Sequence, residues 1–359
     1  MSGMWGNNFK ISIFGESHGE GIGATICGVP SGLEIDNDYI IAELLRRAGG
    51  HDSLSTPRLE ADEFKILSGV FEGRATGSPI CILIPNTNTI SKDYDKIKDY
   101  MRPSHADYTA FVKYGGNNDY RGGGHFSGRI TAALVAAGAI AKMYLKSKGI
   151  IVGGHILSIG EVSEQKFDVI DEELLKALAS KKFAVVDDII GIKMKEEIQK
   201  AKLEQDSIGG VVEAAVIGLP VGIGEPFFDS VESVISHLLF SIPAVKGVEF
   251  GAGFNISKMR GSVANDSIYE EDGKIYTKTN NNGGINGGIT NGMPIIVRTA
   301  FKPTPSISKE QQTVDIKAMK NVHYSIHGRH DPCIVQRAVV VVESAVAIGI
   351  AELILEGKC

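Results

Sequence analysis

The segment FSGRITAALVAAGAIAKMYLKSK, residues 126–148, carries the clearest helical pattern in the chain and decides the fold. Its larger apolar residues recur with a period of about 3.6, and Gly149 ends the pattern. Small residues at positions 132, 133 and 136–138 allow neighbouring elements to approach closely. We therefore expect this helix to lie in the core.

The apolar run at residues 338–355 predicts a second core helix, which closes the chain. The run is short for a membrane span, and it contains Glu343, Gly349 and Glu352. These features favour a buried helix, so we expect no membrane partner.

Other elements lie on both sides of the central helix. Strand-like runs occupy residues 9–14, 23–29, 64–69, 79–84, 211–219 and 294–300, and further helical patterns occupy 38–48, 183–206 and 229–242, the last with Asp229 as its N-cap. The order lacks the regular strand–helix alternation of a dinucleotide-binding sheet, and no Pro/Ser linker divides the chain. We predict one compact α+β unit, a single domain over residues 1–359, rather than two domains.

Composition excludes several classes of protein. The 359 residues carry 37 Lys and Arg against 43 Asp and Glu, and the resulting net charge of −6 argues against a dedicated nucleic-acid binder. Cys27, Cys81, Cys333 and Cys359 form no CxxC pair, which argues against a zinc cage or a disulfide framework. The first nine residues do not resemble a signal peptide. We expect a cytoplasmic protein.

The first chemical motif is GESHG at residues 15–19, directly after a predicted strand. It matches the G-x-S-x-G pattern of a nucleophile elbow, which requires a helix directly behind the serine. Here glycines and a second strand follow, so the pattern favours a simple turn. The turn still places Ser17 and His18, two groups that can transfer protons, on one rim.

Two more motifs lie in the polar stretch before the central helix. In RPSHADY, residues 102–108, a hydrogen-bonded turn competes with anion binding by Arg102 beside a titratable His105. In DYRGGGHFSGR, residues 119–129, three glycines at the expected helix start indicate phosphate or cofactor binding. The second motif is neither a P-loop nor a G-x-G-x-x-G sequence.

Loops in the second half of the chain carry the remaining candidates. GRHDPC, residues 328–333, follows His323 and His327, and it indicates a charged loop at a site. Metal binding is the competing interpretation, although the spacing matches no standard zinc pattern. KPTPS at 302–306 and the Gly/Asn-rich stretch at 280–292 are predicted first as turns.

Arginines beside glycine or histidine recur along this acidic chain. They are Arg46, Arg47, Arg102, Arg121, Arg129 and Arg329. If they converge, they form a cationic pocket for a small anion that carries phosphate and carboxylate groups, rather than for a polymer.

Taken together, the motifs resemble the chorismate synthase family over nearly the whole chain. The similarity rests on FGESHG (14–19), RPSHADYT (102–109), KYG (113–115), DYRGGG (119–124), AAGAIAK (136–142), SIGG (207–210), AVKGVEF (244–250), NGGINGGI (282–289), KPTPSI (302–307) and GRHDPC (328–333).

The resemblance implies a lyase that converts 5-enolpyruvylshikimate 3-phosphate to chorismate and phosphate by an anti 1,4-elimination. This reaction is the last step of the shikimate pathway to aromatic amino acids. The resemblance also implies dependence on reduced FMN without net redox change. It further implies a single-domain β-α-β sandwich with a helical core, and a homotetramer. No flavin-reductase domain is recognisable, so reduced FMN would come from an external source.

The resemblance also implies roles for individual residues. His18 would protonate the departing phosphate, and His105 would hold the reduced flavin in its active protonation state. Ser17 and Asp331 would relay the proton that flavin N5 takes from C6. The implied substrate-binding residues are Arg47, Arg102, Arg129 and Arg329. The implied FMN-binding residues are His125, Phe126, Ser127, Pro243, Ala244, Gly287, Lys302, Pro303, Thr304, Pro305, Ser306 and Arg329.

The chain departs from the usual family pattern at several positions. Ser53 replaces an arginine, which weakens the case for NADP binding, and His125 and Phe126 replace small or basic residues in the glycine-rich motif. Two alternatives stay open. One is a serine hydrolase built on Ser17, and the other is a non-catalytic protein that binds phosphorylated metabolites.

Overall fold

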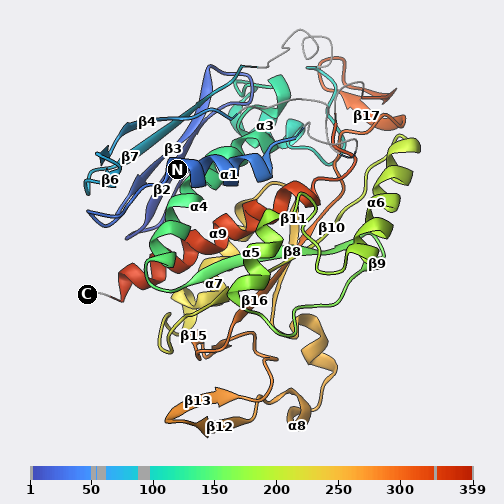
Figure 1. The fold of residues 1–359 in the computed structure, drawn as a ribbon. Helices are drawn as coiled ribbons and strands as arrows, with labels where there is room; N and C mark the ends of the chain where they lie inside the picture. The colour runs from blue at the N-terminus through green and yellow to red at the C-terminus, as the bar shows by residue number, and fades with distance from the viewer. Residues whose placement is uncertain (1–2, 50–53, 55–61, 88–97, 327–329, 358–359) are drawn as a thin grey trace.

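The computed structural model describes residues 3–49, 54, 62–87, 98–326 and 330–357 (Figure 1). Its centre is the predicted pair of helices, α4 (Thr131–Lys146) and α9 (Val335–Glu356), which pack against each other. A Cβ atom on Gly138 of α4 would lie 2.6 Å from the Cα of Ser344 on α9. Glycine at this position therefore permits the close approach of the two helices.

Both central helices are long and apolar enough, by length and composition alone, to span a membrane. The apolar segment that contains α4 is 83% buried inside the protein, however, and that of α9 is 89% buried. The structure therefore places both as core helices, as the charged residues within the C-terminal run predict.

The first sheet covers one side of this helical pair. Its five antiparallel strands have the order β1 (Met4–Trp5), β2 (Lys10–Gly15), β3 (Gly21–Cys27), β7 (Ile80–Pro85) and β4 (Lys65–Ser68). Strands β2, β3 and β7 contact α4, and α1 (Asn37–Arg47) packs on both α4 and α9. Alternating buried isoleucines on β7, at positions 80, 82 and 84, give the sheet its apolar face.

The second five-stranded sheet covers the other side. Its antiparallel order is β11 (Val245–Phe250), β16 (Ile295–Phe301), β10 (Gly210–Ile217), β8 (Ile151–Ile159) and β9 (Val162–Ser163). Helix α9 packs on β8 and β10, and α5 (Glu172–Ser180) also packs on β8. Figure 1 shows the two sheets on opposite sides of α4 and α9, which is an α+β sandwich with a helical core.

The remaining elements lie around these layers. They are β5 (Val70–Phe71), β6 (Arg74–Ala75), α3 (Asp107–Tyr114), α6 (Asp188–Leu203), α7 (Val231–Ser241), α8 (Gly261–Ala264), β12 (Ile268–Glu271), β13 (Lys274–Thr277), β14 (Ile285–Asn286), β15 (Ile289–Thr290), β17 (Gln311–Asp315) and β18 (Lys320–Tyr324), with 3₁₀ turns at Arg121–Phe126, Gly128–Ile130, Phe227–Asp229 and Gly253–Lys258.

Two predictions about helix starts are wrong. The central helix begins at Thr131 rather than Phe126, because Gly122, Gly123 and Gly124 all adopt positive φ angles and form a turn. The cap of α7 is Ser230 rather than Asp229, since the Ser230 hydroxyl accepts a hydrogen bond from the Ser233 amide at 3.1 Å.

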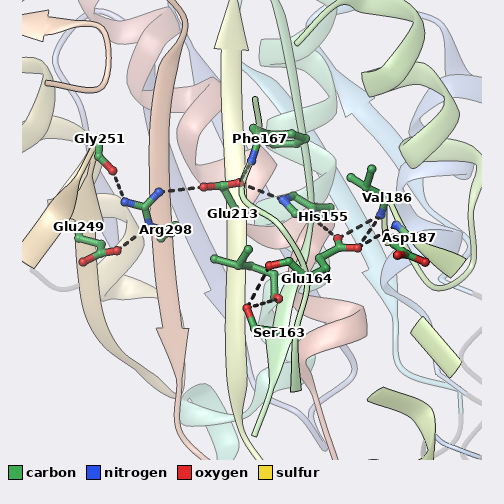
Figure 2. A network of polar contacts seen from close by, with 11 residues as sticks. His155, Ser163, Glu164, Phe167, Val186, Asp187, Glu213, Glu249, Gly251 and Arg298 are labelled. Atoms are coloured by element: carbon green, nitrogen blue, oxygen red, sulfur yellow. Dashed lines mark hydrogen bonds and ion pairs between the residues drawn. The ribbon is translucent and has the colours of Figure 1, made fainter. Parts of the chain in front are cut away.

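A row of charged side chains crosses four strands of the second sheet. His155, Glu213, Arg298 and Glu249 are cross-strand neighbours on β8, β10, β16 and β11. His155 Nε2 lies 3.0 Å from Glu213, and Arg298 donates to Glu213 at 2.8 Å and to Glu249 at 2.5 Å (Figure 2). Glu164 contacts the other ring nitrogen of His155. This row ties the strands together by alternating charge.

This row predicts a pH dependence of stability. Burial opposes protonation of His155, but Glu164 and Glu213 outweigh it and raise the pKa above its ordinary 6.5. Because the pKa of His155 is higher in the folded than in the unfolded state, protonation of His155 stabilises the fold. This stabilisation is fully present below about pH 6.5, and it is lost as the pH rises through the folded-state pKa. The melting temperature should therefore fall over that interval.

The variant His155→Gln should be destabilised by about 3–5 kcal/mol, because it removes the charged imidazole that pairs with two buried carboxylates, those of Glu164 and Glu213. It should also lose most of the pH dependence above pH 6.5. His323→Gln, at an exposed position on β18, is the control. An unchanged pH profile of the melting temperature in His155→Gln would contradict the assignment.

Candidate active site

Loops from both sheets and from the central helices line one cavity of about 1260 Å³. Its wall includes the turn after β2, the end of α1, the loop before α3, the segment that leads into α4, the loop after β16 and the loop before α9. The predicted site residues in the wall are Ser17, Arg47, Arg102, His105, His125, Phe126, Ser127, Arg129, Pro243, Ala244, Lys302, Thr304, Pro305, Ser306 and Asp331.

The glycine-rich turn holds the two predicted catalytic histidines in place. Cβ atoms added to Gly122 would lie 2.3 Å from the His18 ring, and Cβ atoms added to Gly123 would lie 3.0 Å from the His105 ring. The Gly124 carbonyl accepts a hydrogen bond from the Ser17 amide at 3.1 Å. The backbone of Gly122 and Gly123, without side chains, therefore lies between His18 and His105. The hydrogen bond to the Gly124 carbonyl fixes the turn after β2.

His18 is buried behind this turn, with 8% of its surface exposed, and it is not itself one of the cavity-lining residues. Ser17 is also almost completely buried but does line the cavity. Strand β3 follows the Ser17–His18 turn, so no helix lies directly behind the serine. This local structure does not have the geometry of a nucleophile elbow.

His105 belongs to a compact cluster at the start of α3. Its Nδ1 lies 2.6 Å from Asp107 Oδ1, and Arg102 donates to Asp107 from Nε at 2.7 Å and from Nη2 at 2.8 Å. Burial raises the pKa of Asp107, but the hydrogen bonds from Arg102 and His105 outweigh it and hold the pKa well below its ordinary value. Asp107 is therefore ionised at neutral pH.

Two more predicted substrate-binding arginines share one carboxylate. Arg47, the last residue of α1, donates to Asp62 at 2.8 Å, and Arg129 donates to the other oxygen of Asp62. Arg129 Nε also donates to Asn86 at 3.1 Å. All three members of the Arg47–Asp62–Arg129 group are nearly fully buried, so the carboxylate fixes both guanidinium groups at the cavity wall.

Asp331 is joined to the Arg47 backbone through a shared partner, Arg337. Arg337 of α9 donates from Nη1 to Asp331 at 2.6 Å and from Nε to the Arg47 carbonyl at 2.7 Å. The neighbouring His330 also lines the cavity, and burial lowers its pKa to about 4, so its ring is neutral at pH 7. The loop before α9 is thereby joined to the end of α1.

The wall formed by residues 302–306 has features of a binding site for a large polar ligand. Thr304 Oγ1 is buried and has no hydrogen-bond partner among the described residues. Lys302 donates to the Ser104 carbonyl, and both Ser104 and Ala244 adopt positive φ angles. Backbone strain of this kind in non-glycine residues is typical of functional sites.

A family model for chorismate synthase matches residues 9–355. The chain belongs to the chorismate synthase family. The chorismate synthase of Pyrococcus abyssi is 47% identical over 352 residues, which cover 98% of this chain and 97% of that protein. The chorismate synthase of Thermococcus kodakarensis is 47% identical over 355 residues, or 99% and 98% of the two chains.

A crystal structure of chorismate synthase matches the fold with a TM-score of 0.78 at 30% identity, over 98% of this chain and 93% of that one. The predicted α+β fold is thus confirmed, and membership of the family makes the protein a lyase.

Some residues that the chorismate synthase resemblance implies lie away from the cavity. Gly287 is exposed in the turn between β14 and β15, and Pro303 is exposed beside the cavity-lining Lys302. Arg329 and Ser53 lie outside the described residues.

Two of the recurring arginines also do not line the cavity. Arg46 donates to Glu43 at 2.8 Å and to Glu343 at 2.7 Å, and Lys142 contacts the same two carboxylates within the helical core. Arg121 is paired with Asp119 at the rim. Arg46 therefore belongs to the structural core of this chorismate synthase family member.

Sequence reasoning missed three residues of the site. Asp62, Asp107 and Arg337 each contact a predicted site residue. Asp107 lies within the RPSHADY motif, and its spacing from His105 could have identified it. Asp62 is distant in sequence from Arg129, and Arg337, although near Asp331 in sequence, lies outside the GRHDPC motif, so no motif indicates either residue. No group of three or more His, Cys, Asp or Glu side chains among the described residues could hold a metal ion.

Proposed function

We propose that the chain converts 5-enolpyruvylshikimate 3-phosphate to chorismate and phosphate, using reduced FMN without net redox change, as the last step of the shikimate pathway. The observation that carries this proposal is one cavity in which basic side chains predominate, beside the histidines His105, His125, His237 and His330. Its basic residues are Arg47, Arg102, Lys113, Arg129, Lys246, Lys302 and Arg337, against Glu16, Asp119 and Asp331.

The substrate carries a phosphate and two carboxylates, and such groups prefer planar guanidinium donors. Asp62 and Asp107 hold three of the arginines in fixed positions. A fixed guanidinium loses less side-chain entropy when an anion binds, so the carboxylates prepare the arginines for binding.

Each proton-handling residue then has a proposed role. His18 protonates the departing phosphate oxygen, and Ser17 with Asp331 carries away the proton removed from C6. Ser17 and His18 lie together on the turn after β2, against the glycine-rich turn, and Asp331 lies in the loop before α9. A general acid positioned in this way contributes about 10²–10⁴ in rate.

The residues present fit a flavin. The unsatisfied Thr304 hydroxyl, Lys302 and the strained Ala244 backbone offer polar contacts, and Phe126 with its neighbour Tyr114 supplies an aromatic surface, with ring centroids 6.3 Å apart. Residues 243–244 and 302–306 would hold the cofactor. Bound reduced FMN supplies electron density to the breaking C–O bond.

Other family properties accompany this proposal. We propose a cytoplasmic homotetramer that receives reduced FMN from an external source. The exposed position of Gly287 is compatible with a flavin contact made across a subunit interface. Binding of NADP stays a prediction of the resemblance, which Ser53 weakens.

The test of the function is anaerobic phosphate release from the substrate, with and without reduced FMN. A protein that only binds phosphorylated metabolites would bind the substrate and release no phosphate. Release that requires reduced FMN would support the proposal.

Arg47→Ala should weaken substrate binding by about 2–4 kcal/mol, because it removes a charged donor from a desolvated anion. Titration calorimetry with the substrate measures the change. Arg102→Ala should have an effect of the same size, as should Arg329→Ala if Arg329 reaches the cavity.

The matched control is Arg260→Ala, at an exposed position before α8. Melting temperatures of all variants separate lost binding from lost folding. Wild-type affinity in Arg47→Ala would mean that this arginine does not contact the substrate.

A further inference from the structure

The imidazole of His105 is held from one side by charged groups and faces the glycine turn with the other. Asp107 from α3 and Arg102 from the preceding loop contact Nδ1, at 2.6 and 3.1 Å. The edge formed by Cε1 and Nε2 is the one that Cβ atoms at position 123 would meet, at 3.0 and 3.1 Å. The two ring nitrogens therefore have different surroundings.

The contact with Asp107 decides which nitrogen carries the proton of the neutral ring. Asp107 is ionised and can only accept hydrogen bonds. An unprotonated Nδ1 would place a lone pair 2.6 Å from a carboxylate oxygen, which is repulsive, whereas Nδ1–H makes a short charge-assisted hydrogen bond. The 3.1 Å approach of Arg102 Nη2 to Nδ1 is longer, and the same Nη2 donates to Asp107 at 2.8 Å.

We infer that Asp107 is a positioning residue that holds His105 as the Nδ1–H tautomer, so that the Nε2 lone pair is what this ring offers to a ligand in the cavity. His105 then accepts a hydrogen bond at Nε2 from a ligand N–H or O–H group. The inference depends on the proposed function only for the identity of that ligand, which would be the reduced flavin.

The surrounding charges keep the ring neutral. Burial lowers the pKa of His105, the positive charges of Arg102 and of Lys302 after β16 lower it further, and Asp107 opposes them without reversing the shift. Nε2 of the neutral ring is thus an acceptor at pH 7, and it becomes a donor only when the ring is protonated.

The experiment is long-range ¹H–¹⁵N correlation spectroscopy of histidine-labelled protein at neutral pH, without flavin or substrate. Loss of a signal in His105→Ala assigns the ring. In the wild type we expect a protonated Nδ1 and an unprotonated Nε2. An Nε2–H tautomer in the wild type would overturn the inference, and this measurement needs no variant at position 107.

Asp107→Asn should reverse the tautomer. Arg102 would hold the amide oxygen, which turns the amide NH₂ toward Nδ1 and leaves the ring proton on Nε2. A corresponding Asp→Asn change in serine proteases lowers turnover through the wrong tautomer. The control is Asp188→Asn, which breaks an exposed ion pair with Lys181 and should leave the His105 signals unchanged. An unchanged tautomer in Asp107→Asn would overturn the inference.

Activity then tests whether the tautomer matters to the reaction. Asp107→Asn should lower turnover by ~10²-fold or more. The double variant with His105→Ala should be no slower than His105→Ala alone, because Asp107 acts through the ring. Additive losses, or full activity with a reversed tautomer, would overturn the positioning role. If the wild type shows no phosphate release at all, the proposed function fails while the spectra still decide the tautomer.

Discussion

Phosphate release from 5-enolpyruvylshikimate 3-phosphate should be undetectable without flavin and should appear when dithionite-reduced FMN is added under anaerobic conditions. The cavity wall consists of acids, bases, cations and apolar groups, which bind anions and move protons. Such side chains do not lend electron density reversibly to a breaking C–O bond, whereas a reduced flavin does. Oxidised FMN should therefore bind without supporting turnover.

Three controls exclude other sources of phosphate release. Dithionite alone tests for chemical hydrolysis, oxidised FMN tests for a purely structural effect, and His18→Ala with reduced FMN tests for release that does not use the site. Equal activity with and without flavin would refute the proposed function. Covalent labelling of Ser17 by a fluorophosphonate would instead favour a serine hydrolase, and the strand that follows Ser17 argues against it.

His18→Ala and His105→Ala should each lower turnover by about 10²-fold or more while the fold survives. The two losses should differ in kind. His18, buried behind Gly122, should affect phosphate departure. His105, which offers Nε2 to the cavity, should affect the flavin, so its loss should also shift the pH at which bound reduced flavin deprotonates.

Turnover and melting temperature measured on the same samples separate catalysis from structure. His323→Ala, on an exposed strand far from both motifs in sequence, is the control and should change neither quantity. If His18 and His105 were only structural, alanine would lower the melting temperature and leave activity per folded molecule intact. That result would end the catalytic assignment.

The central layers of the fold follow from periodicity. Long apolar runs in the sequence predict the helices α4 and α9, because a helix buried on all sides needs few polar residues. Strand β8 was not predicted, since its two glycines and His155 interrupt the apolar pattern. Helix α3 was also missed, because its eight residues lie in a polar stretch whose stability comes from tertiary contacts.

The candidate site could be predicted only in part for a related reason. Motifs reveal residues that are close in sequence, and they located the glycine turn and the His105 loop. The carboxylate that joins Arg47 to Arg129 comes from position 62, and only the folded chain brings these three together. The start of α4 was misplaced because a glycine triplet fits both a helix entry and a left-handed turn.

The cluster of Arg46, Glu43, Lys142 and Glu343 bears on how the core helices find their alignment. The facing surfaces of α4 and α9 are mostly apolar, so a slip of one turn, about 5.4 Å, would still bring apolar side chains together. Such a slip would carry Glu343 away from Lys142 and Arg46 and leave charges unpaired in the core, at a cost of about 3–5 kcal/mol. We therefore expect the ion cluster, together with the close contact between Gly138 and Ser344, to select one longitudinal register during folding.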